Sequence, residues 1–385
     1  MYKIATLNKI SQKGLSLFSD QYELTTELSG ADAVLVRSQD MYGADLSDGI
    51  LAIARAGAGV NNIPVDLCTE NGVVVFNTPG ANSNAVKELV LAALLITARN
   101  VVEAVDWTRT ISNNAAETVE KNKSRFAGEE IQGKRLAVIG LGAIGVLVAN
   151  AANSLGMKVV GYDPFISVQN AHDLNPAVKL YDSLDACLPA CDYVTIHVPA
   201  VDSTKGMFNY KMLDAMKNKA VLLNFSRDSL VVSADVKKVL EEKKLRLYVT
   251  DFPTDDLLGT ENAILIPHLG ASTKESEENC AVSAASQLIN YLEEGTIENS
   301  INFPTLNPGK KTDGSRICVL NKNVPSILGK LTGVLADMNV NISNLINKSK
   351  GDNAYTVIDL DDDQVDEKKI KEAFDFEGII SVRIL

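Results

Sequence analysis

The sequence predicts an α/β protein whose two lobes are built on doubly wound parallel sheets, followed by a small C-terminal βαββαβ domain. Short β-branched runs alternate with helical patterns, and the runs lie too far apart for hairpins, which favours parallel strands. A stretch rich in Pro, Gly and Lys at 302–314 has no periodicity and is typical of a linker. It sets the last domain apart from the rest.

The N-terminal part alternates predicted strands with turn signals. Strands are expected at 3–7, 33–37, 51–55 and 73–77. A helix at 88–104 is apolar nearly all round, so we expect it to be buried. The polar segment 112–130 that follows is predicted to lie on the surface.

A second series of strands and helices starts at Lys134. Its crossovers require a parallel, doubly wound sheet. The strands are expected at 136–139, 158–162, 193–197, 221–225, 247–250 and 264–266, with a helix following at 275–294.

The last part alternates strands and helices in the βαββαβ order of a ferredoxin-like domain. Its predicted strands are 316–320, 341–347, 354–359 and 379–384, and its predicted helices are 326–338 and 365–374. We expect this domain to be tethered to the rest rather than fused with it.

Composition excludes several classes of partner. The 385 residues carry 37 basic and 49 acidic side chains, a net charge of −12, which argues against nucleic acid and anionic membranes. No apolar run reaches the roughly 18 residues of a membrane span, and the first residues lack a signal-peptide pattern. Five cysteines at irregular spacings indicate reduced thiols and a cytoplasmic location. We predict no metal site, because Cys187 and Cys191 have the character of core thiols.

A glycine motif marks a dinucleotide site. Gly140, Gly142 and Gly145 follow a predicted strand and open a helix in the G-x-G-x-x-G spacing, in which the backbone approaches a pyrophosphate at a helix N-terminus. The next strand ends in Asp163, where a ribose-binding acid belongs. Pro164 and Phe165 follow, with no Arg for a 2′-phosphate, so the sequence favours NAD over NADP.

Three consecutive strands of the second series end near chemically useful side chains. Arg227, Asp255 and His268 follow the fourth, fifth and sixth strands, at the edge where such sheets bind ligands. A base, an acid that orients it and a cation near the developing carbonyl are the groups that alcohol oxidation needs. His197 ends the third strand and either lines the cofactor site or has a structural role.

Several separated motifs occur together in order, at 36–38, 55–62, 77–79, 140–145, 162–164 and 267–275. They resemble the D-isomer-specific 2-hydroxyacid dehydrogenase family. The resemblance implies NAD-dependent oxidation of a 2-hydroxy acid. The expected substrate is 3-phospho-D-glycerate, oxidised to 3-phosphohydroxypyruvate as L-serine synthesis begins.

The resemblance also implies two lobes and their site residues. We expect a discontinuous substrate-binding domain at 1–95 and 275–303, an NAD-binding domain at 96–274, a linker at 304–314 and a regulatory or oligomerisation domain at 315–385. The expected cofactor-binding residues are Gly140, Gly142, Ala143, Ile144, Gly145, Asp163, His197, Val198, Pro199, Phe225, Ser226, Arg227, Thr250, His268, Gly270 and Ala271. The expected substrate-binding residues are Arg37, Ser38, Ala58, Gly59, Val60, Arg227 and His268.

The resemblance also implies a role for each site residue, and the sequence differs from the family pattern at several of these positions. Arg227 is expected to bind the substrate carboxylate and C2 oxygen, and His268 to be the acid/base. Asp255 is expected to be its acidic partner, where the family usually has Glu. Thr250 replaces a cofactor-contacting Asp, and the adjacent Asp251 is expected to point to the opposite face of its strand.

The C-terminal domain resembles ACT domains, which sense amino acids. Asn323 and Asn341 occupy positions where such domains hold a small amino acid between paired subunits, which implies L-serine or another amino acid as ligand and a homo-oligomer. A dimerisation module without a ligand is the alternative. For the whole chain, the alternatives are another 2-hydroxyacid dehydrogenase of the glycerate/hydroxypyruvate or lactate type, or an NAD-sensing, corepressor-like binding protein.

Overall fold

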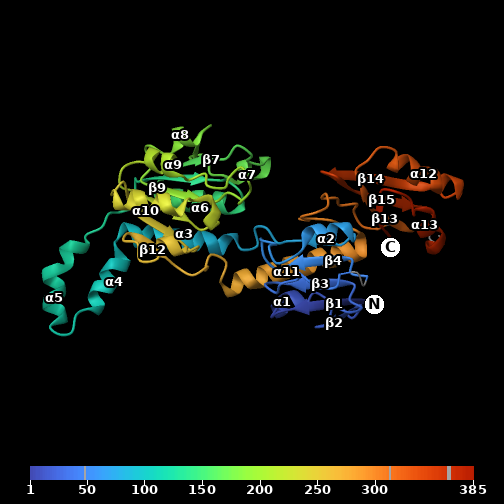
Figure 1. Cartoon of the computed structure of the whole chain (residues 1–385), viewed down its shortest axis with the longest axis horizontal. Helices are drawn as coiled ribbons and strands as arrows, with labels where there is room; N and C mark the ends of the chain where they lie inside the picture. Colours follow the sequence, from blue (N-terminus) through green and yellow to red (C-terminus); the bar gives the residue numbers. More distant parts are fainter. Residues whose placement is uncertain (47–48, 312–313, 362–365) are drawn as a thin grey trace. The chain divides into compact units, whose positions relative to one another are not determined.

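The computed structural model describes residues 1–46, 49–311, 314–361 and 366–385 (Figure 1). Part of the expected linker, residues 312–313, and the first residue of the helix expected at 365–374 lie outside the described residues. The chain forms two compact units, Met1–Asn82 with Lys274–Leu385, and Ser83–Thr273. Within the described ranges, no helix combines the length and apolar character that a membrane crossing requires.

The first unit contains a five-stranded parallel sheet with the order β2-β1-β3-β4-β5. The four predicted strands are confirmed, and an additional short strand, β2, lies at the edge of the sheet, where its polar residues face solvent. The strands are β1 (Tyr2–Leu7), β2 (Tyr22–Thr25), β3 (Ala33–Val36), β4 (Ala52–Arg55) and β5 (Val74–Phe76). The helices that belong to this lobe are α1 (Gln12–Leu15), α2 (Val65–Glu70) and α11 (Lys274–Glu294).

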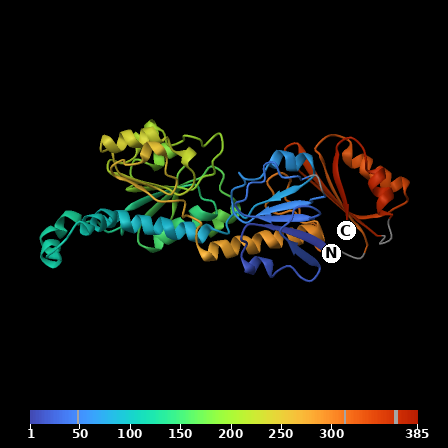
Figure 2. The same ribbon diagram turned by 60° about the horizontal axis from the view of Figure 1, so that its bottom comes forward.

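Helix α11 covers one face of this sheet, as Figures 1 and 2 show. Its small and apolar residues Ala281, Ala284 and Leu288 are buried against the core. At Gly14 of α1 an added Cβ would lie 2.6 Å from the Ala281 carbonyl carbon, so the two helices touch backbone to backbone. The small residues of α11 therefore allow a close approach that larger side chains would prevent.

The second unit contains a seven-stranded parallel sheet with the order β12-β11-β10-β9-β6-β7-β8. The six predicted strands are confirmed, and the two-residue β8 adds an edge strand that is too short to give a pattern. The strands are β6 (Arg135–Ile139), β7 (Lys158–Tyr162), β8 (Lys179–Leu180), β9 (Tyr193–Ile196), β10 (Ala220–Asn224), β11 (Leu245–Thr250) and β12 (Ala263–Leu265). The helices around it include α3 (Ser83–Ala98), α6 (Ala143–Ser154), α7 (Val168–Asp173), α8 (Leu184–Cys187), α9 (Tyr210–Ala215) and α10 (Ser233–Glu241).

Separate apolar clusters pack on the two faces of this sheet, which confirms the doubly wound arrangement. Successive β6 residues alternate between them: Leu136 and Val138 belong to the cluster with α3 and α6, and Ala137 and Ile139 to the cluster with α9 and α10. A strand buried on both faces gives the continuous apolar run that marked it in the sequence.

The predicted single helix at 88–104 is wrong beyond Ala98. The chain breaks at Asn100, whose φ of 50° is left-handed, and continues as α4 (Val101–Arg109). Asn tolerates this conformation better than most residues. Unlike α3, neither α4 nor α5 (Ala115–Asn122) buries a residue. The surface location predicted for 112–130 is confirmed.

The C-terminal sheet confirms the predicted βαββαβ order. It is antiparallel, with the strand order β14-β15-β13-β16. Its elements are β13 (Arg316–Lys322), α12 (Ile327–Asp337), β14 (Ile342–Lys350), β15 (Asn353–Leu360), α13 (Glu367–Ala373) and β16 (Ile379–Ile384).

This sheet packs against the N-terminal part of the same unit, which holds the five-stranded sheet and α11. The expected flexible tether between the two is not observed among the described residues. Leu306, within the expected linker, is fully buried and pairs with Ile297. Cys318 and Tyr355 of the C-terminal sheet share an apolar cluster with the first lobe. The Tyr355 hydroxyl donates to the Gly295 carbonyl, 2.7 Å away.

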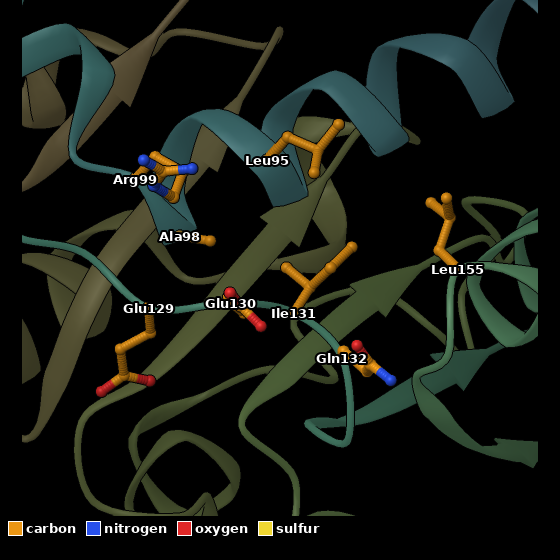
Figure 3. Close-up of a pocket in the computed structure, with 8 residues that line it drawn as sticks. All are labelled: Leu95, Ala98, Arg99, Glu129, Glu130, Ile131, Gln132 and Leu155. Carbon is orange, nitrogen blue, oxygen red and sulfur yellow. The ribbon is translucent and has the colours of Figure 1, made fainter.

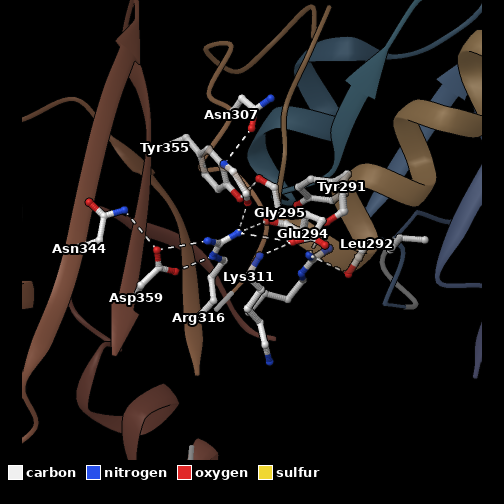
Figure 4. A network of polar contacts seen from close by, with 12 residues as sticks. Tyr291, Leu292, Glu294, Gly295, Asn307, Lys311, Arg316, Asn344, Tyr355 and Asp359 are labelled. Atoms are coloured by element: carbon white, nitrogen blue, oxygen red, sulfur yellow. Dashed lines mark hydrogen bonds and ion pairs between the residues drawn. The ribbon is translucent and has the colours of Figure 1, made fainter. Parts of the chain in front are cut away.

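Arg316 is the polar centre of this contact (Figure 4). Its side chain is 1% exposed, with Nε 2.5 Å from Asp359 Oδ1 and Nη2 3.2 Å from Asp359 Oδ2. Its Nη1 donates to the carbonyls of Glu294 and Gly309, each 2.8 Å away. Arg383 Nη2 donates to the Tyr291 carbonyl at 2.7 Å. Two arginines thus satisfy carbonyls in the last turn of α11, where a helix favours positive charge.

We expect Arg316→Met to lower the free energy of unfolding by about 3–5 kcal/mol, because it leaves the buried Asp359 carboxylate without its counter-charge. Urea unfolding followed by circular dichroism measures the loss. The double variant Arg316→Met, Asp359→Leu removes both buried charges of this pair and should recover much of the loss. A single variant as stable as the wild type would contradict this account of the contact.

Candidate active site

The β6–α6 turn forms a cradle with the geometry that a dinucleotide pyrophosphate needs. Gly140 has φ +91°, and an added Cβ would lie 2.5 Å from the His197 carbonyl oxygen. At Gly145 an added Cβ would lie 1.9 Å from the Gly140 carbonyl oxygen. At Gly142, the residue before α6, an added Cβ would meet nothing within 4 Å. Two glycines are therefore required by packing, and the third leaves space at a helix N-terminus where an anion fits.

Asp163 lies at the end of β7 beside this turn. Its Oδ2 accepts from the Leu141 N–H and its Oδ1 from the Phe165 N–H, each at 2.8 Å. These two bonds hold the carboxylate in a fixed orientation next to the glycine turn. Each oxygen keeps a further lone pair, as the predicted bonds to ribose hydroxyls require.

His197 follows β9, across the switch point of the strand order from β6. Its Nε2 lies 2.9 Å from Thr195 Oγ1, whereas its Nδ1 is buried without a hydrogen-bond partner among the described residues. Burial lowers the pKa of His197 to about 3, so the imidazole is neutral at pH 7. A neutral His next to the glycine turn serves packing and cofactor contact better than proton transfer.

The other predicted cofactor residues lie along the same edge of the sheet. Val198 and Pro199 follow β9, Phe225 and Ser226 follow β10, and Gly270 and Ala271 lie in the turn after β12. The Ser226 hydroxyl donates to the Ile196 carbonyl at 2.7 Å and links two neighbouring strand ends. Thr250 is fully buried, and its hydroxyl is used within the chain, donating to the Asn224 carbonyl at 2.8 Å.

Phe252 brings two of the three predicted catalytic residues together. The centroid of its ring is 4.5 Å from that of the His268 ring. The Arg227 guanidinium carbon lies 5.7 Å from the centroid of the Phe252 ring. Asp255 is different: it begins a short 3₁₀ turn (Asp255–Leu257), is exposed, and makes no hydrogen bond or ion pair with His268 among the described residues.

Asp251 occupies a buried position that the sequence pattern did not predict. This residue is 1% exposed, and its Oδ2 accepts from the Gly270 N–H at 2.8 Å. Burial raises the pKa of Asp251, while the Gly270 hydrogen bond and the positive charges of His268 and Arg227 lower it. A charged residue directly after a buried strand was the available signal.

The predicted substrate residues of the first unit follow β3 and β4. Arg37 Nη2 lies 2.8 Å from Glu277 Oε1 of α11, and both side chains are exposed. The Ser38 N–H donates to Asn8 Oδ1 at 3.0 Å. The Asn77 side chain donates to the Ala58 carbonyl at 2.6 Å, holding the turn that continues through Gly59 and Val60. Arg37 and Ser38 lie at the switch point between β1 and β3, where open α/β sheets bind ligands.

A shallow hollow of about 230 Å³ lies at the opposite, amino-terminal edge of the seven-stranded sheet (Figure 3). Leu95, Ile131 and Leu155 contribute apolar surface from three separate segments, and Glu129 and Glu130 are acidic. The residues that lead into β6 and β7 line it, so it is distinct from the glycine turn.

Comparisons with known proteins agree with this arrangement. Residues 91–270 match the model of the D-isomer specific 2-hydroxyacid dehydrogenase NAD binding domain. The D-3-phosphoglycerate dehydrogenases of Escherichia coli K12 and Haemophilus influenzae are 31% and 30% identical, over 95% of this chain and 90% and 89% of theirs. A Methanocaldococcus jannaschii relative of the same name is 32% identical over 89% of this chain, which spans 64% of that relative's length.

Solved structures share the fold. The NAD⁺-bound 3-phosphoglycerate dehydrogenase of Entamoeba histolytica superposes with a TM-score of 0.62 at 24% identity, covering 79% of this chain and 99% of its own. The match across nearly the whole chain, together with the glycine turn and the residues at the strand ends, leads to one conclusion. The protein is an NAD-binding oxidoreductase and belongs to the D-isomer-specific 2-hydroxyacid dehydrogenase family.

Proposed function

We propose that the protein is a D-3-phosphoglycerate dehydrogenase, which oxidises 3-phospho-D-glycerate to 3-phosphohydroxypyruvate in the first step of L-serine synthesis. The observation that carries the proposal is the likeness to two bacterial enzymes of that name over 95% of this chain, C-terminal domain included. That domain favours this activity over the glycerate/hydroxypyruvate or lactate alternatives.

The reaction assigns a task to each group at the strand ends. His268, as a neutral imidazole, takes the proton of the C2 hydroxyl. Arg227 holds the substrate carboxylate and the C2 oxygen in line through charge-assisted hydrogen bonds. NAD, held at the glycine turn and by Asp163, would supply the acceptor for the hydride that leaves C2. The resemblance assigns Asp255 as the carboxylate that supports the resulting imidazolium.

The first unit supplies binding groups for the two anionic ends of the substrate. Backbone N–H groups of Ala58, Gly59 and Val60 form a turn able to hold the carboxylate. Arg37 is the cation for the phosphate, and its ion pair with Glu277 is exposed, hence weak enough for a dianionic phosphate to replace.

We expect an NADH absorbance assay over 2-hydroxy and 2-oxo acids to give the highest kcat/KM for 3-phospho-D-glycerate and its product. Arg37→Gln should lower that kcat/KM about 10- to 100-fold by raising the KM for the substrate, because a charged hydrogen bond is lost. The KM for NAD should stay unchanged. Arg109→Gln, on the exposed α4, is the matched control.

Preference for D-glycerate or D-lactate would instead identify another dehydrogenase of the family. Absence of turnover with every acid, alongside NADH binding, would favour the corepressor-like alternative. An Arg37→Gln variant with unchanged kcat/KM would remove this residue from the site.

The arm formed by α4, α5 and the 3₁₀ turn Lys123–Phe126 supports a homo-oligomer. None of its elements buries a residue, and Figure 1 shows α4 and α5 extending away from the sheet of their unit. Val101, Val102 and Val105 are each about 40% exposed, and they follow Ala98 and Arg99, which line the hollow at Leu95 and Leu155. Contiguous exposed apolar surface marks an interaction site. A second copy of this chain is the proposed occupant.

We predict that light scattering after gel filtration finds a dimer or larger assembly for the wild type. Val102→Glu with Val105→Glu should reduce it to a monomer with unchanged circular dichroism, because two charges cannot be buried in the interface without partners. Glu103→Gln on the same helix is the control. A monomeric wild type, or a double variant of unchanged mass, would contradict the assignment.

The C-terminal domain is proposed to bind L-serine or a similar amino acid at Asn323 and Asn341. Both side chains are exposed at its loops. The Asn323 amide donates to the Gly351 carbonyl at 3.1 Å, and the Asn341 amide donates to Asp361. Neutral amides of this kind are able to bind both the amino and the carboxylate group of a ligand.

L-Serine at ten times its Kd should add about 1.4 kcal/mol of stability and raise Tm in a thermal melt, with D-serine as the stereochemical control. Asn323→Ala should abolish the shift. An equal Tm with and without a panel of L-amino acids would leave the domain a dimerisation module without a ligand.

A further inference from the structure

Asp251 is a buried carboxylate with one unsatisfied oxygen, directly after β11. Its Oδ2 accepts from the Gly270 N–H at 2.8 Å, whereas its Oδ1 is buried with no hydrogen-bond partner among the described residues. Leaving a charged acceptor unpaired in the interior is costly, so the position calls for a reason other than stability.

The hydrogen bond ties Asp251 to the turn that carries His268. Gly270 lies two residues after His268, and a Cβ added there would be 3.0 Å from Asp251 Oδ2. A side chain at 270 would thus crowd the carboxylate, and glycine permits the close approach. The neighbouring Phe252 lies against the His268 ring, with centroids 4.5 Å apart at 52°, and beside the Arg227 guanidinium. The Asp251–Phe252 pair therefore touches the turn, the imidazole and the cation.

Three groups interact electrostatically with Asp251. They are His268 after β12, Arg227 after β10 and the Tyr248 phenol on β11. Helix α3 also approaches, since a Cβ added at Gly270 would lie 3.6 Å from Val86 Cγ2. Its Lys87 ammonium is engaged by Asn84 Oδ1 at 2.5 Å and lies 4.0 Å from Glu88. Attraction between Asp251 and His268 is mutual, so an ionised Asp251 stabilises the imidazolium that proton transfer creates.

We propose that Asp251, rather than Asp255, is the carboxylate that positions His268 and stabilises its protonated form, acting through the Gly270 turn and through its charge. The inference rests on the proposed function only in taking His268 as the acid/base. Asp251 is a positioning residue. Asp255, exposed at its 3₁₀ turn, makes no hydrogen bond or ion pair with the imidazole within the described part of the chain.

The chain has only three histidines, which allows a test that needs no substrate. In protein labelled with ¹³C at histidine Cε1, the His268 signal, assigned by its loss in His268→Gln, is followed through a pH titration. Asp251→Asn retains an acceptor for the Gly270 N–H and removes only the charge. We expect its His268 titration midpoint to move to lower pH, because the imidazolium loses a neighbouring negative charge. Asp255→Asn should leave the midpoint unchanged.

Kinetics on the best substrate of the panel give a second readout. Asp251→Asn should lower kcat about tenfold or more, change KM less than about threefold, and shift the acid limb of kcat/KM to lower pH. Asp251→Ala, which also loses the anchor to Gly270, should lose more. NADH binding should stay at its wild-type Kd in Asp251→Asn. Its Tm at pH 7 should not fall, because burial disfavours the ionised carboxylate that the substitution removes.

An unchanged His268 midpoint in Asp251→Asn, or a midpoint that falls in Asp255→Asn instead, would overturn the proposal. These outcomes are independent of which 2-hydroxy acid is the substrate. Failure of the substrate panel would therefore reject the proposed function without rejecting the pairing of Asp251 with His268.

Discussion

The close approach of the β6–α6 turn to β9 is the constraint on which the second unit depends. The Gly140 backbone packs against the His197 carbonyl, and Gly145 packs against Gly140 in turn, with no room for a Cβ at either place. This contact leaves the N-terminus of α6 next to open space. It also holds the end of β6 beside β9, where the strand order reverses. Because all strands of this sheet are parallel, the carboxyl ends of the remaining strands lie along the same edge as the glycine turn.

Helix α11 has a comparable place in the first unit. Its small residues let it lie against the sheet and α1, and its last carbonyls accept hydrogen bonds from Arg316 and Arg383 of the C-terminal sheet. Its first turn holds Glu277, paired with Arg37. One helix thus links the proposed phosphate-binding residue to the proposed regulatory domain. The net charge of −12 describes the surface, whereas these cations are local.

The fold was largely predictable from sequence because most strands are buried on both faces and appear as continuous apolar runs. The elements that were missed, β2 and β8, are short edge strands with polar residues. The break at Asn100 was missed because apolar residues continue beyond it. The sequence pattern gives no sign that these residues are exposed on α4. The packed C-terminal domain was missed because a Pro- and Gly-rich stretch gives no sign that Leu306 is buried.

The fold class, the glycine turn with Asp163, and the strand ends that carry Arg227 and His268 were all predictable from the sequence, since each depends on residues that are neighbours along the chain. The tertiary structure was needed to show which carboxylate is anchored to the turn that carries His268. Asp251 and Asp255 both follow β11, and the path of the chain after the strand turns one inward to Gly270 and leaves the other in solvent. That choice depends on the turn after β12, which local sequence pattern does not specify.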